Sequence, residues 1–550
     1  MKPDFDVAVL GGGMIGAVSA LTLRKRGLTV AVLEARPKGR EQKVVVGEAI
    51  TEGTSLYLRH ELGLEPWFKA NSYRKFGFDF VTLPEHGEAL TIEDCNEFML
   101  SQAPLERIPK AYEKLIPTYH VERPALNDHL GELARAAGAD WHWGAAIEHV
   151  ALSEDESPHT VRYQQGGQPM TLTARWVVDC SGRKCLLGRQ LGIHHKVSPP
   201  NTAAVWNRFE NVAADPAIWR SYHGIDRRRH TIHFTGKGFW IWWIHQNDDS
   251  TSVGVTWDKD QHQPDVKADD HGFSEMIGKF PVVAKLLAGA RAKEPYQLLA
   301  HLPYRSDHWI SEKRYALLGD AAWFTDALYS IGLETACRQV VSLTKGILDD
   351  KAGRACPSSF FAGLNQQFDY CCRAVARMNE FKYKHGWHDP YVLAQTVLYE
   401  TAEIGPLYQL RDRADWTWDK QREFYGIQWG SQKRLDAIER FLAESLPDGQ
   451  TPRMPETRLL KKGLLPGPFI YAFTWPLWNV PALNHYFFRM IRTWGHMERL
   501  SQRHRLWPDV LSRMAMGRIE SAGHLLKSLA AAGRAQKEPL PEAGRRNVGV

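Results

Sequence analysis

Residues 5–34 read FDVAVLGGGMIGAVSALTLRKRGLTVAVLE and contain an apolar strand, a glycine-rich turn, a helix and a second apolar strand. In the G-x-G-x-x-G turn the first glycine allows a tight bend, the second lets the backbone approach a pyrophosphate, and the third lets the helix pack closely. An acidic residue ends the second strand, where a carboxylate can accept the hydroxyls of a ribose. The stretch therefore predicts a Rossmann-type dinucleotide-binding unit. Its predicted cofactor-binding residues are Gly11, Gly13, Met14, Ile15, Gly16 and Glu34.

Two later strand-like stretches indicate which dinucleotide is bound. Residues 176–183 (WVVDCSGR) and 315–322 (YALLGDAA) each run from an apolar strand into a polar turn, and residues 121–124 read VERP. In this order the motifs resemble the large FAD-dependent family that includes aromatic hydroxylases. The resemblance implies that FAD is the cofactor, that Asp320 approaches its ribityl and phosphate part, and that Arg123 contacts the flavin. The sequence contains no second dinucleotide fingerprint, so we expect a separate flavin reductase to reduce the FAD.

Three further segments are similar to flavin-dependent halogenases. Residues 239–245 (FWIWWIH) nearly match the halogenase signature W-x-W-x-I-P, and residues 46–49 (VGEA) resemble its G-E-(A/S) element. Residues 324–332 (FTDALYSIG), called here the 324–332 turn, resemble the segment that holds the flavin ring and the halide. The alternative for the tryptophans is a core strand with alternating aromatic residues. The resemblance implies cofactor binding by Gly47, Glu48, Ala49 and Gly332, halide binding by Ile331 and Gly332, and a wall between flavin and substrate formed by Trp240, Trp242, Trp243 and His245.

The halogenase resemblance also implies a reaction and a catalytic lysine. Such enzymes use reduced flavin, O2 and chloride or bromide to make hypohalous acid, which must travel through a closed passage to the substrate. At the end of that passage a lysine hydrogen-bonds the hypohalous acid or forms a haloamine. A compact ammonium whose pKa responds to burial suits both versions. By order and context the lysine is Lys75, in the stretch NSYRKFGF at 71–78, and Lys69 is the rival.

Three departures from the halogenase pattern bear on the substrate. His245 replaces the proline of the signature, Ala327 replaces a proline of the 324–332 turn, and Tyr329 stands where tryptophan-type enzymes carry a glutamate base. The last departure argues against free tryptophan and favours a phenol, a pyrrole or another electron-rich aromatic substrate, either free or tethered to a carrier protein. The alternative functions are a flavin-dependent aromatic monooxygenase that does not halogenate and a flavin-binding partner without turnover.

Composition argues against several other classes of protein. The chain has 550 residues, and its 69 Lys and Arg against 63 Asp and Glu give a net charge of +6. Basic clusters interleaved with aromatic residues are missing, so nucleic acid is not an expected partner. The seven cysteines lack C-x-x-C spacing, which is typical of a reducing, cytoplasmic setting and predicts neither disulfides nor a metal site. Tryptophan is unusually frequent, with 20 residues, and pockets for flat ligands are often lined by aromatic side chains.

The pattern along the chain predicts an α/β fold with three parts. We expect residues 1–345 to form a Rossmann-type FAD-binding domain with an inserted, substrate-binding β-sheet at about 75–120 and 195–310, where short aromatic and alternating runs predominate. Residues 346–528 are expected to be mainly helical. The apolar residues that mark one helical face there are Phe361, Leu364, Phe368, Cys372, Val375, Met378 and Phe381. Residues 529–550 have the composition of a disordered tail.

Residues 464–488 contain no Asp, Glu, Lys or Arg, which raises the question of whether this stretch spans a membrane. It is rich in aromatic residues but contains four prolines and two asparagines, whereas a membrane-spanning helix needs about 20 apolar residues with internal hydrogen bonds. We therefore expect the stretch to pack against the body of the protein or to line a pocket, with shallow membrane contact as the alternative. Trp475, Trp478 and Trp494 are the candidates for pocket lining or surface docking in this region.

Overall fold

The computed structural model describes most of residues 2–389 and a few later positions. The described residues are 2–40, 46–83, 89–103, 106, 116–213, 215–221, 224–246, 249–262, 266–354, 357–389, 392–393, 396–397, 400, 435–436 and 438–439, together with the backbone of 462–466. The predictions for Trp475, Trp478, Trp494, the 529–550 tail and nearly all of 464–488 lie outside these residues. Among the residues described, no helix combines the length and the apolar content that a membrane span requires.

The first sheet carries the glycine-rich unit. Its eight strands run in the order β20 (Ile310–Ser311), β21 (Tyr315–Leu317), β11 (Gln168–Asp179), β1 (Phe5–Leu10), β2 (Val30–Glu34) and β8 (Asp140–Trp143), with β10 (His159–Gln165) and β9 (Ala146–Ala151) continuing from β11. β1 pairs in parallel with β2 and β11, and β11 pairs in parallel with β21. Because parallel strands end at the same edge of a sheet, the glycine turn after β1 meets the polar turns after β11 and β21.

Helices pack against this sheet and complete its core. They are α1 (Met14–Lys25), α2 (Glu52–Leu56), α3 (Glu65–Asn71), α5 (Arg123–Ala136), α6 (Leu186–Gln190) and α9 (Ile331–Lys351), with a π-helical turn (Tyr57–Glu61) between α2 and α3. Apolar residues of the strands, such as Val9 and Val177, are fully buried in one cluster with Leu21 of α1, Leu130 of α5 and Val340 of α9. Their burial explains why the apolar runs of the sequence form central strands.

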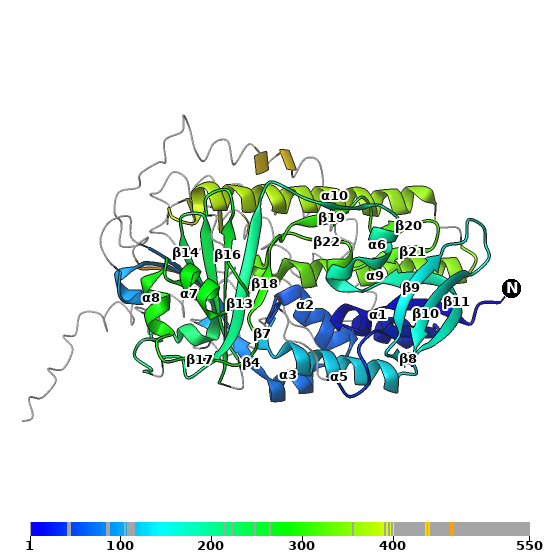
Figure 1. Ribbon diagram of the computed structural model, residues 1–550, viewed down its shortest axis with the longest axis horizontal. Coiled ribbons are helices and arrows are strands. Elements are labelled where there is room, and N and C mark those ends of the chain that lie inside the picture. Colours follow the sequence, from blue (N-terminus) through cyan, green and yellow to red (C-terminus); the bar gives the residue numbers. More distant parts are fainter. Residues whose placement is uncertain are drawn as a thin grey trace, which may run out of the picture.

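The second sheet is mainly antiparallel and lies beside the first (Figure 1). Its nine strands run in the order β17 (Arg291–Ala292), β13 (Thr202–Glu210), β16 (Thr251–Asp258), β15 (Phe239–His245), β14 (His230–Gly236), β5 (Gly77–Thr82), β6 (Asn96–Ser101) and β23 (Lys462–Pro466), with β18 (Gln297–Leu299) beside β13. One face packs against α7 (Asp270–Ile277) and α8 (Pro281–Leu286) in a second apolar core. The other face contributes to a third cluster, which contains the functional candidates described below.

Two small three-stranded sheets complete the described fold. The first consists of β3 (Ala49–Ile50), β7 (Thr118–Val121) and β4 (Ser72–Lys75), and the second of β12 (His194–Lys196), β19 (Tyr304–Ser306) and β22 (Trp323–Phe324). In the first small sheet β7 lies in the centre, where His120 faces Ala49 and Thr118 faces Lys75. This arrangement brings the G-E-A segment and the candidate lysine onto strands that share one neighbour.

Helix α10 (Ser358–Phe381) runs along both sheets, as Figure 1 shows. Its buried apolar residues Phe361, Phe368 and Cys372 belong to the core of the first sheet. Beyond α10 a π-helical turn (Lys382–Gly386) follows, and its Tyr383, together with Trp387, packs in the third cluster beside the second sheet. The predicted α/β fold class is confirmed, and the predicted apolar face of this helix is the face that is buried. The division of the whole chain into three parts stays a prediction.

Arg227, in the helical turn Arg227–Arg229, pairs with the buried acids Asp79 and Glu97 of the second sheet and with the half-exposed Glu93 beside it. Its side chain is 1% exposed, and it lies 2.6 Å from Glu97, 2.6 Å from Glu93 and 3.9 Å from Asp79. We expect Arg227→Ala to lower the free energy of unfolding by about 3–5 kcal/mol, because the buried carboxylates lose their cation. Chemical denaturation monitored by circular dichroism measures the change.

The matched control is Arg291→Ala. Arg291 pairs with Glu210 at the edge of the same sheet, but its side chain is 71% exposed. Exposed ion pairs contribute little, so this change is expected to cost less than about 1 kcal/mol. Equal losses in the two variants would contradict the role given to Arg227.

Candidate functional site

The glycine turn has the geometry that the sequence predicts. Gly11 has φ +102°, and a Cβ there would lie 2.7 Å from the carbonyl oxygen of Cys180. A Cβ on Gly16 would lie 1.9 Å from the carbonyl oxygen of Gly11, so both positions exclude any side chain. A Cβ on Gly13 would meet nothing within 4 Å. The first and third glycines are thus needed for packing, whereas the second leaves open space at the start of α1, beside Met14 and Ile15.

Glu34, at the end of β2, stabilises the same turn through hydrogen bonds. Its carboxylate accepts hydrogen bonds from the backbone N–H of Gly12 at 2.7 Å and of Arg36 at 2.7 Å. Each bond uses one lone pair of a different oxygen, and a carboxylate offers about four acceptor sites. Acceptor capacity therefore remains for the hydroxyls of a ribose at this end of the sheet.

Arg123, the first residue of α5, connects two other predicted cofactor elements. Its Nη1 donates to the backbone carbonyls of Val46 at 3.0 Å and Gly47 at 3.1 Å. Gly47 has φ +100°, and a Cβ there would lie 2.4 Å from that Nη1. Burial raises the pKa of Asp320, while the positive charges of Arg183 and Arg123 oppose the rise. Arg123 and Asp320, two residues of the predicted cofactor site, are therefore close enough to influence each other's charge.

Several groups around this site suit FAD as a ligand. Arg123 Nε and Arg183 Nη1 are buried and have no hydrogen-bond partner among the described residues. Each is a donor that a phosphate or a flavin oxygen could satisfy. Together with the open space beside Gly13 and the acceptors of Glu34, they match the requirements of a dinucleotide with an extended phosphate part.

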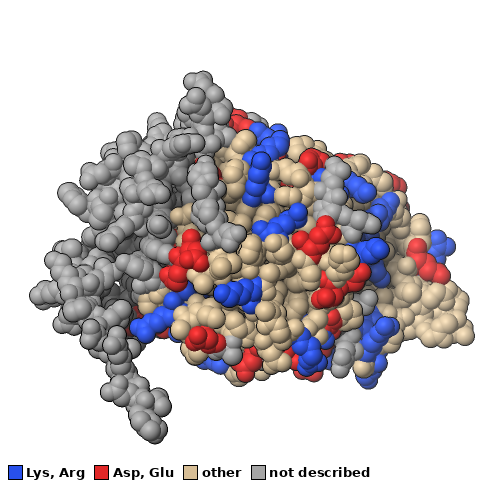
Figure 2. All heavy atoms as spheres, turned by 60° about the vertical axis from the view of Figure 1, so that its left-hand side comes forward, with Lys and Arg blue, Asp and Glu red and all other residues tan. Residues whose placement is uncertain are grey.

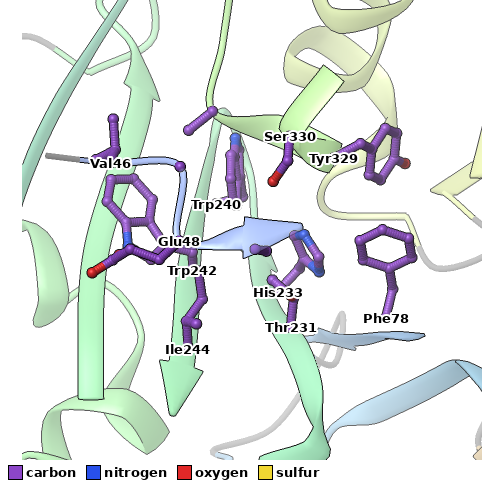
Figure 3. A pocket seen from close by; sticks show the side chains of 13 residues that line it. Val46, Glu48, Phe78, Thr231, His233, Trp240, Trp242, Ile244, Tyr329 and Ser330 are labelled. Atoms are coloured by element: carbon purple, nitrogen blue, oxygen red, sulfur yellow. The ribbon is translucent and has the colours of Figure 1, made fainter. Parts of the chain in front are cut away.

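A pocket lies where the remaining motifs meet. Figure 3 shows side chains from β14, from β15, from the 46–49 segment and from the 324–332 turn converging on it. The pocket is partly open to solvent. The residues that line it are Val46, Gly47, Glu48, Ala49, Phe78, Thr231, His233, Trp240, Trp242, Ile244, Ala327, Tyr329 and Ser330.

Strand β15 divides its aromatic residues between two faces. Trp240 and Trp242 line the pocket, and we call these two residues the tryptophan wall. Trp243, which the sequence prediction included in that wall, packs on the opposite face in the core with α7 and α8. Its Nε1 donates to His245 Nε2 at 3.1 Å. Because side chains alternate along a strand, Trp243 cannot face the same pocket as its neighbour Trp242.

Both ring nitrogens of His245 form hydrogen bonds outside the pocket. Besides the bond from Trp243, its Nδ1 lies 3.2 Å from Thr251 Oγ1. Burial and, to a smaller extent, the charge of the nearby Arg228 lower the pKa of His245 to about 3, although the Asp226 carboxylate opposes the shift. The ring is therefore neutral at physiological pH, and it is not among the residues that line the pocket.

Lys75, at the end of β4, is buried beside the pocket. Its side chain is 2% exposed, and its Nζ lies 4.1 Å from the centre of the Phe78 ring, which lines the pocket. Burial lowers the pKa of Lys75 to about 8, although the Glu52 carboxylate opposes the shift. The rival Lys69 is 71% exposed and pairs with Glu65 at 3.0 Å. Of the two candidate lysines, Lys75 is the one whose side chain contacts a residue that lines the pocket, namely Phe78.

Glu48, from the predicted G-E-A element, forms a buried ion pair. Its Oε1 lies 3.1 Å from Arg208 Nε, and Arg208 Nη1 lies 2.9 Å from Glu122. Burial raises the pKa of Glu48, and the charge of Arg208 opposes the rise. Sequence reasoning missed Arg208, although an arginine inside the apolar strand β13 was the available signal.

Sequence reasoning also missed the polar residues of the pocket, Thr231 and His233. The ring of His233 stacks on Phe80 at 4.7 Å, and its Nδ1 lies 3.3 Å from the carbonyl oxygen of Asp79. Burial lowers the pKa of His233 to about 3, so the ring is neutral. With a proton on Nδ1 for that carbonyl, Nε2 is an acceptor. The alternation of Thr231, His233 and Thr235 in a fully buried strand was the signal for a polar face.

The predicted halide residues lie at the start of α9. Ile331 is its first residue, preceded by Tyr329 and Ser330 with φ 59° and 54°, and Ser330 lines the pocket. A Cβ on Gly332 would meet nothing within 4 Å. First-turn amides lack partners within a helix, and the helix dipole favours an anion there. Within the described residues no group of three His, Cys, Asp or Glu is placed to hold a metal ion.

Comparison with known proteins identifies the family. Residues 4–360 match the family described as FAD binding domain, and the chain belongs to this family. The chain is 29% identical over 343 residues to the 1H-pyrrole-2-carbonyl-(peptidyl-carrier protein) chlorinase of Pseudomonas fluorescens, covering 60% of this chain and 73% of that protein. It is 25% identical over 402 residues to the flavin-dependent halogenase chlA of Dictyostelium discoideum, covering 68% of this chain and 64% of that protein.

A crystal structure of the halogenase PltM has the same fold, with a TM-score of 0.61 and 18% identity over 93% of this chain and 96% of that one. The predicted resemblance to flavin-dependent halogenases is confirmed, and so is the prediction that the chain is an FAD-dependent enzyme. The roles of the individual site residues stay predictions.

Replacing Arg123 tests the cofactor site. We expect Arg123→Met to weaken FAD binding about tenfold or more, because the 46–47 backbone loses its donor and Asp320 loses a nearby positive charge. Titration of FAD fluorescence quenching gives the Kd. Arg135→Met, at the other end of α5, is the control, since the Arg135 side chain contacts the Gly131 carbonyl, at 3.2 Å, and the Trp143 ring, whose centre is 5.6 Å away, rather than the 46–47 backbone. Unchanged FAD affinity in Arg123→Met would remove this residue from the site.

Proposed function

We propose that this chain is an FAD-dependent halogenase that transfers chlorine or bromine to an electron-rich aromatic substrate. The observation that supports the proposal most is the pocket, which the G-E-A segment, the tryptophan wall and the 324–332 turn line together, with the buried Lys75 against Phe78. These segments are separated by up to about 280 residues in the sequence, so their meeting at one pocket is what a shared site requires.

Bound FAD, reduced by a separate flavin reductase, would supply hypohalous acid from O2 and a halide. The chain's own contribution begins with binding, for which Arg123, Glu34 and the glycine turn are the candidates. First-turn amides of α9 at Ile331 and Gly332 would hold the halide. Trp240 and Trp242 would separate substrate from flavin, so that oxygen transfer to the ring is suppressed and hypohalous acid stays enclosed.

Lys75 would direct the halogen in one of two ways. As an ammonium it donates a hydrogen bond to the oxygen of hypohalous acid and makes the halogen more electrophilic. As a neutral amine it displaces hydroxide from the halogen, which yields a haloamine and water once the amine proton is transferred. Attack by the aromatic ring on the haloamine then forms the carbon–halogen bond and breaks the nitrogen–halogen bond. The ring proton passes to the lysine nitrogen, directly or through a base, which restores the amine. A pKa of about 8 makes both forms of Lys75 available near neutral pH.

The substrate class follows from the pocket and the relatives. The pocket lining includes the aromatic side chains of Phe78, Trp240, Trp242 and Tyr329 and the neutral acceptor His233, which suits a flat ring bearing an N–H or O–H group. One relative is by name a chlorinase of a pyrrole carried on a peptidyl-carrier protein. A phenol or pyrrole, free or carrier-tethered, is therefore the proposed substrate. The alternative is an aromatic monooxygenase of the same fold, which would yield hydroxylated rather than halogenated product.

Replacing Lys75 separates these functions. With reduced FAD, O2, bromide and a panel of phenols and pyrroles, we expect brominated products from the native protein. Lys75→Ala should lower their yield at least 100-fold while FAD binding and oxygen consumption persist. Mass spectrometry of the products measures the yield. Lys69→Ala, which removes the exposed rival lysine, should retain native activity.

A different outcome would redirect the assignment. Hydroxylated products at equal rates in the native protein and in Lys75→Ala would favour the monooxygenase. Bound FAD without oxygen consumption on any substrate would favour a binding partner without turnover.

The pH dependence tests the two versions of Lys75. If the haloamine forms, the halogenation rate should rise with pH through about 8, because the neutral amine is the reactive species. If the ammonium donates a hydrogen bond, the rate should fall through the same pH. Lys75→Arg stays protonated and should lose this pH limb, keeping partial activity only in the hydrogen-bond version. A native profile without a limb near pH 8 would argue against titration of Lys75 in catalysis.

A further inference from the structure

The π-helical turn Lys382–Gly386 follows α10 and contacts the tryptophan wall, although it lies beyond residues 4–360, which match the FAD binding domain family. The hydroxyl of Tyr383 accepts a hydrogen bond from Trp240 Nε1 at 3.0 Å. The same hydroxyl lies 2.7 Å from Asp326 Oδ2 and 2.7 Å from Thr256 Oγ1. The Tyr383 side chain is buried, so these bonds have no competition from bulk water. One phenol thus joins the wall, strand β16 and the 324–332 turn.

These three contacts use the whole hydrogen-bonding capacity of the phenol. A hydroxyl has one proton to donate and two lone pairs to accept with. The carboxylate of Asp326 has no proton to give when ionised, so Tyr383 donates to it and accepts from Trp240 and from the Thr256 hydroxyl. Loss of the hydroxyl would therefore remove one hydrogen-bond partner from the indole N–H of Trp240 and one from the carboxylate of Asp326.

The end of α10 contacts the 324–332 turn at two more places. Asn379 Nδ2 donates to Thr325 Oγ1 at 3.4 Å. Lys382, which pairs with Glu400, has its Nζ 5.1 Å from the centre of the Tyr329 ring. Residues spaced three and four apart on a helix share a face. Asn379, Lys382 and Tyr383 therefore contact the 324–332 turn from a single face of this helical segment.

The 324–332 turn needs such support because part of it is strained. Tyr329 and Ser330 both adopt left-handed backbone conformations, which L-residues other than glycine rarely adopt. Residues in such conformations persist only where the surroundings determine them. Directly after them α9 begins, and its first turn carries the predicted halide residues.

We propose that Tyr383 is a positioning residue that fixes the tryptophan wall relative to the 324–332 turn and thereby shapes the flavin end of the pocket. The proposal rests on the proposed function in that the turn lies against bound FAD, and its second test also needs the halogenation activity. Tyr383 acts through Trp240 and Asp326 and touches neither halide nor substrate.

The first test measures FAD binding and needs no turnover. Titration by fluorescence quenching is carried out on the full chain with Tyr383→Phe, Asp326→Asn and the double variant. We expect each single variant to raise the Kd for FAD about tenfold, and the double variant to be no weaker than the singles, because both remove the same bond. Tyr163→Phe is the matched control, since Tyr163 is an equally buried tyrosine whose hydroxyl lies 3.2 Å from His142 Nδ1 in the first sheet.

The pH dependence of FAD binding adds a readout that a general packing role would not move. Burial raises the pKa of Asp326 to about 6, and the Tyr383 hydroxyl and the Lys382 charge oppose the rise. The backbone N–H groups of Leu328 and Ala327 also stabilise the ionised carboxylate. Without the Tyr383 hydroxyl the pKa of Asp326 should be higher. As the pH is lowered, Tyr383→Phe should therefore lose FAD affinity at a higher pH than the native protein does.

The second test asks whether hypohalous acid stays enclosed. With reduced FAD, O2 and bromide, monochlorodimedone in solution traps any hypobromous acid that escapes. We expect Tyr383→Phe to release at least three times more per FAD oxidised than the native protein, while Tyr163→Phe is unchanged. If Tyr383→Phe does not fold, as judged by circular dichroism, Asp326→Asn and Trp240→Phe carry the same comparisons.

The outcomes separate the two proposals. Native FAD affinity in Tyr383→Phe, or additive losses in the double variant, would overturn the positioning role. A native protein that binds FAD but never brominates the trap or any substrate would overturn halogenation, while the FAD titrations still decide the role of Tyr383.

Discussion

The alternation of side chains along β15 is the constraint on which the rest of the site depends. Trp240 and Trp242 face the pocket, while Ile241 and Trp243 face the core with α7 and α8. The strand is hydrogen-bonded on both sides, to β14 and to β16, so it cannot shift along its neighbours. A slip by one residue would exchange the two faces and place the wrong aromatic residues at the pocket. The same register carries the Trp240 indole to Tyr383.

The charges around the pocket are balanced in different ways. Arg208 is paired directly with Glu48 and Glu122, which keeps its charge stable in a buried position. For Lys75 burial is the larger effect, and the Glu52 carboxylate offsets it only in part. A buried group whose pKa is moved toward neutrality is a common property of catalytic residues, whereas a fully compensated ion pair is structural. This difference distinguishes Lys75 from the other buried cations near the pocket.

Local sequence signals predicted much of the fold and half of the pocket. The strand–turn–helix geometry of the glycine turn, the position of Glu34 at the end of β2 and the apolar face of α10 depend on spacings within one or two elements, and the structure has all three, while the cofactor roles of these residues stay predictions. Phe78 and His233 could not be placed, because they meet only through the parallel pairing of β5 with β14, and Thr82 and Thr235 in those strands are 153 residues apart. Trp243 was assigned to the wall although strand alternation separates it from Trp242, so this misplacement was avoidable.

The start of α9 shows why a halide there would bind weakly. The helix dipole and free first-turn amides favour an anion at Ile331 and Gly332. In the same turn, however, Glu334 is buried, accepts a hydrogen bond from Thr51 at 3.0 Å and lies 3.4 Å from Arg338. A negative charge on Glu334 would repel an anion, and Arg338, 3.4 Å away, would oppose that repulsion. Weak binding suits an ion that would be consumed and replaced in every cycle.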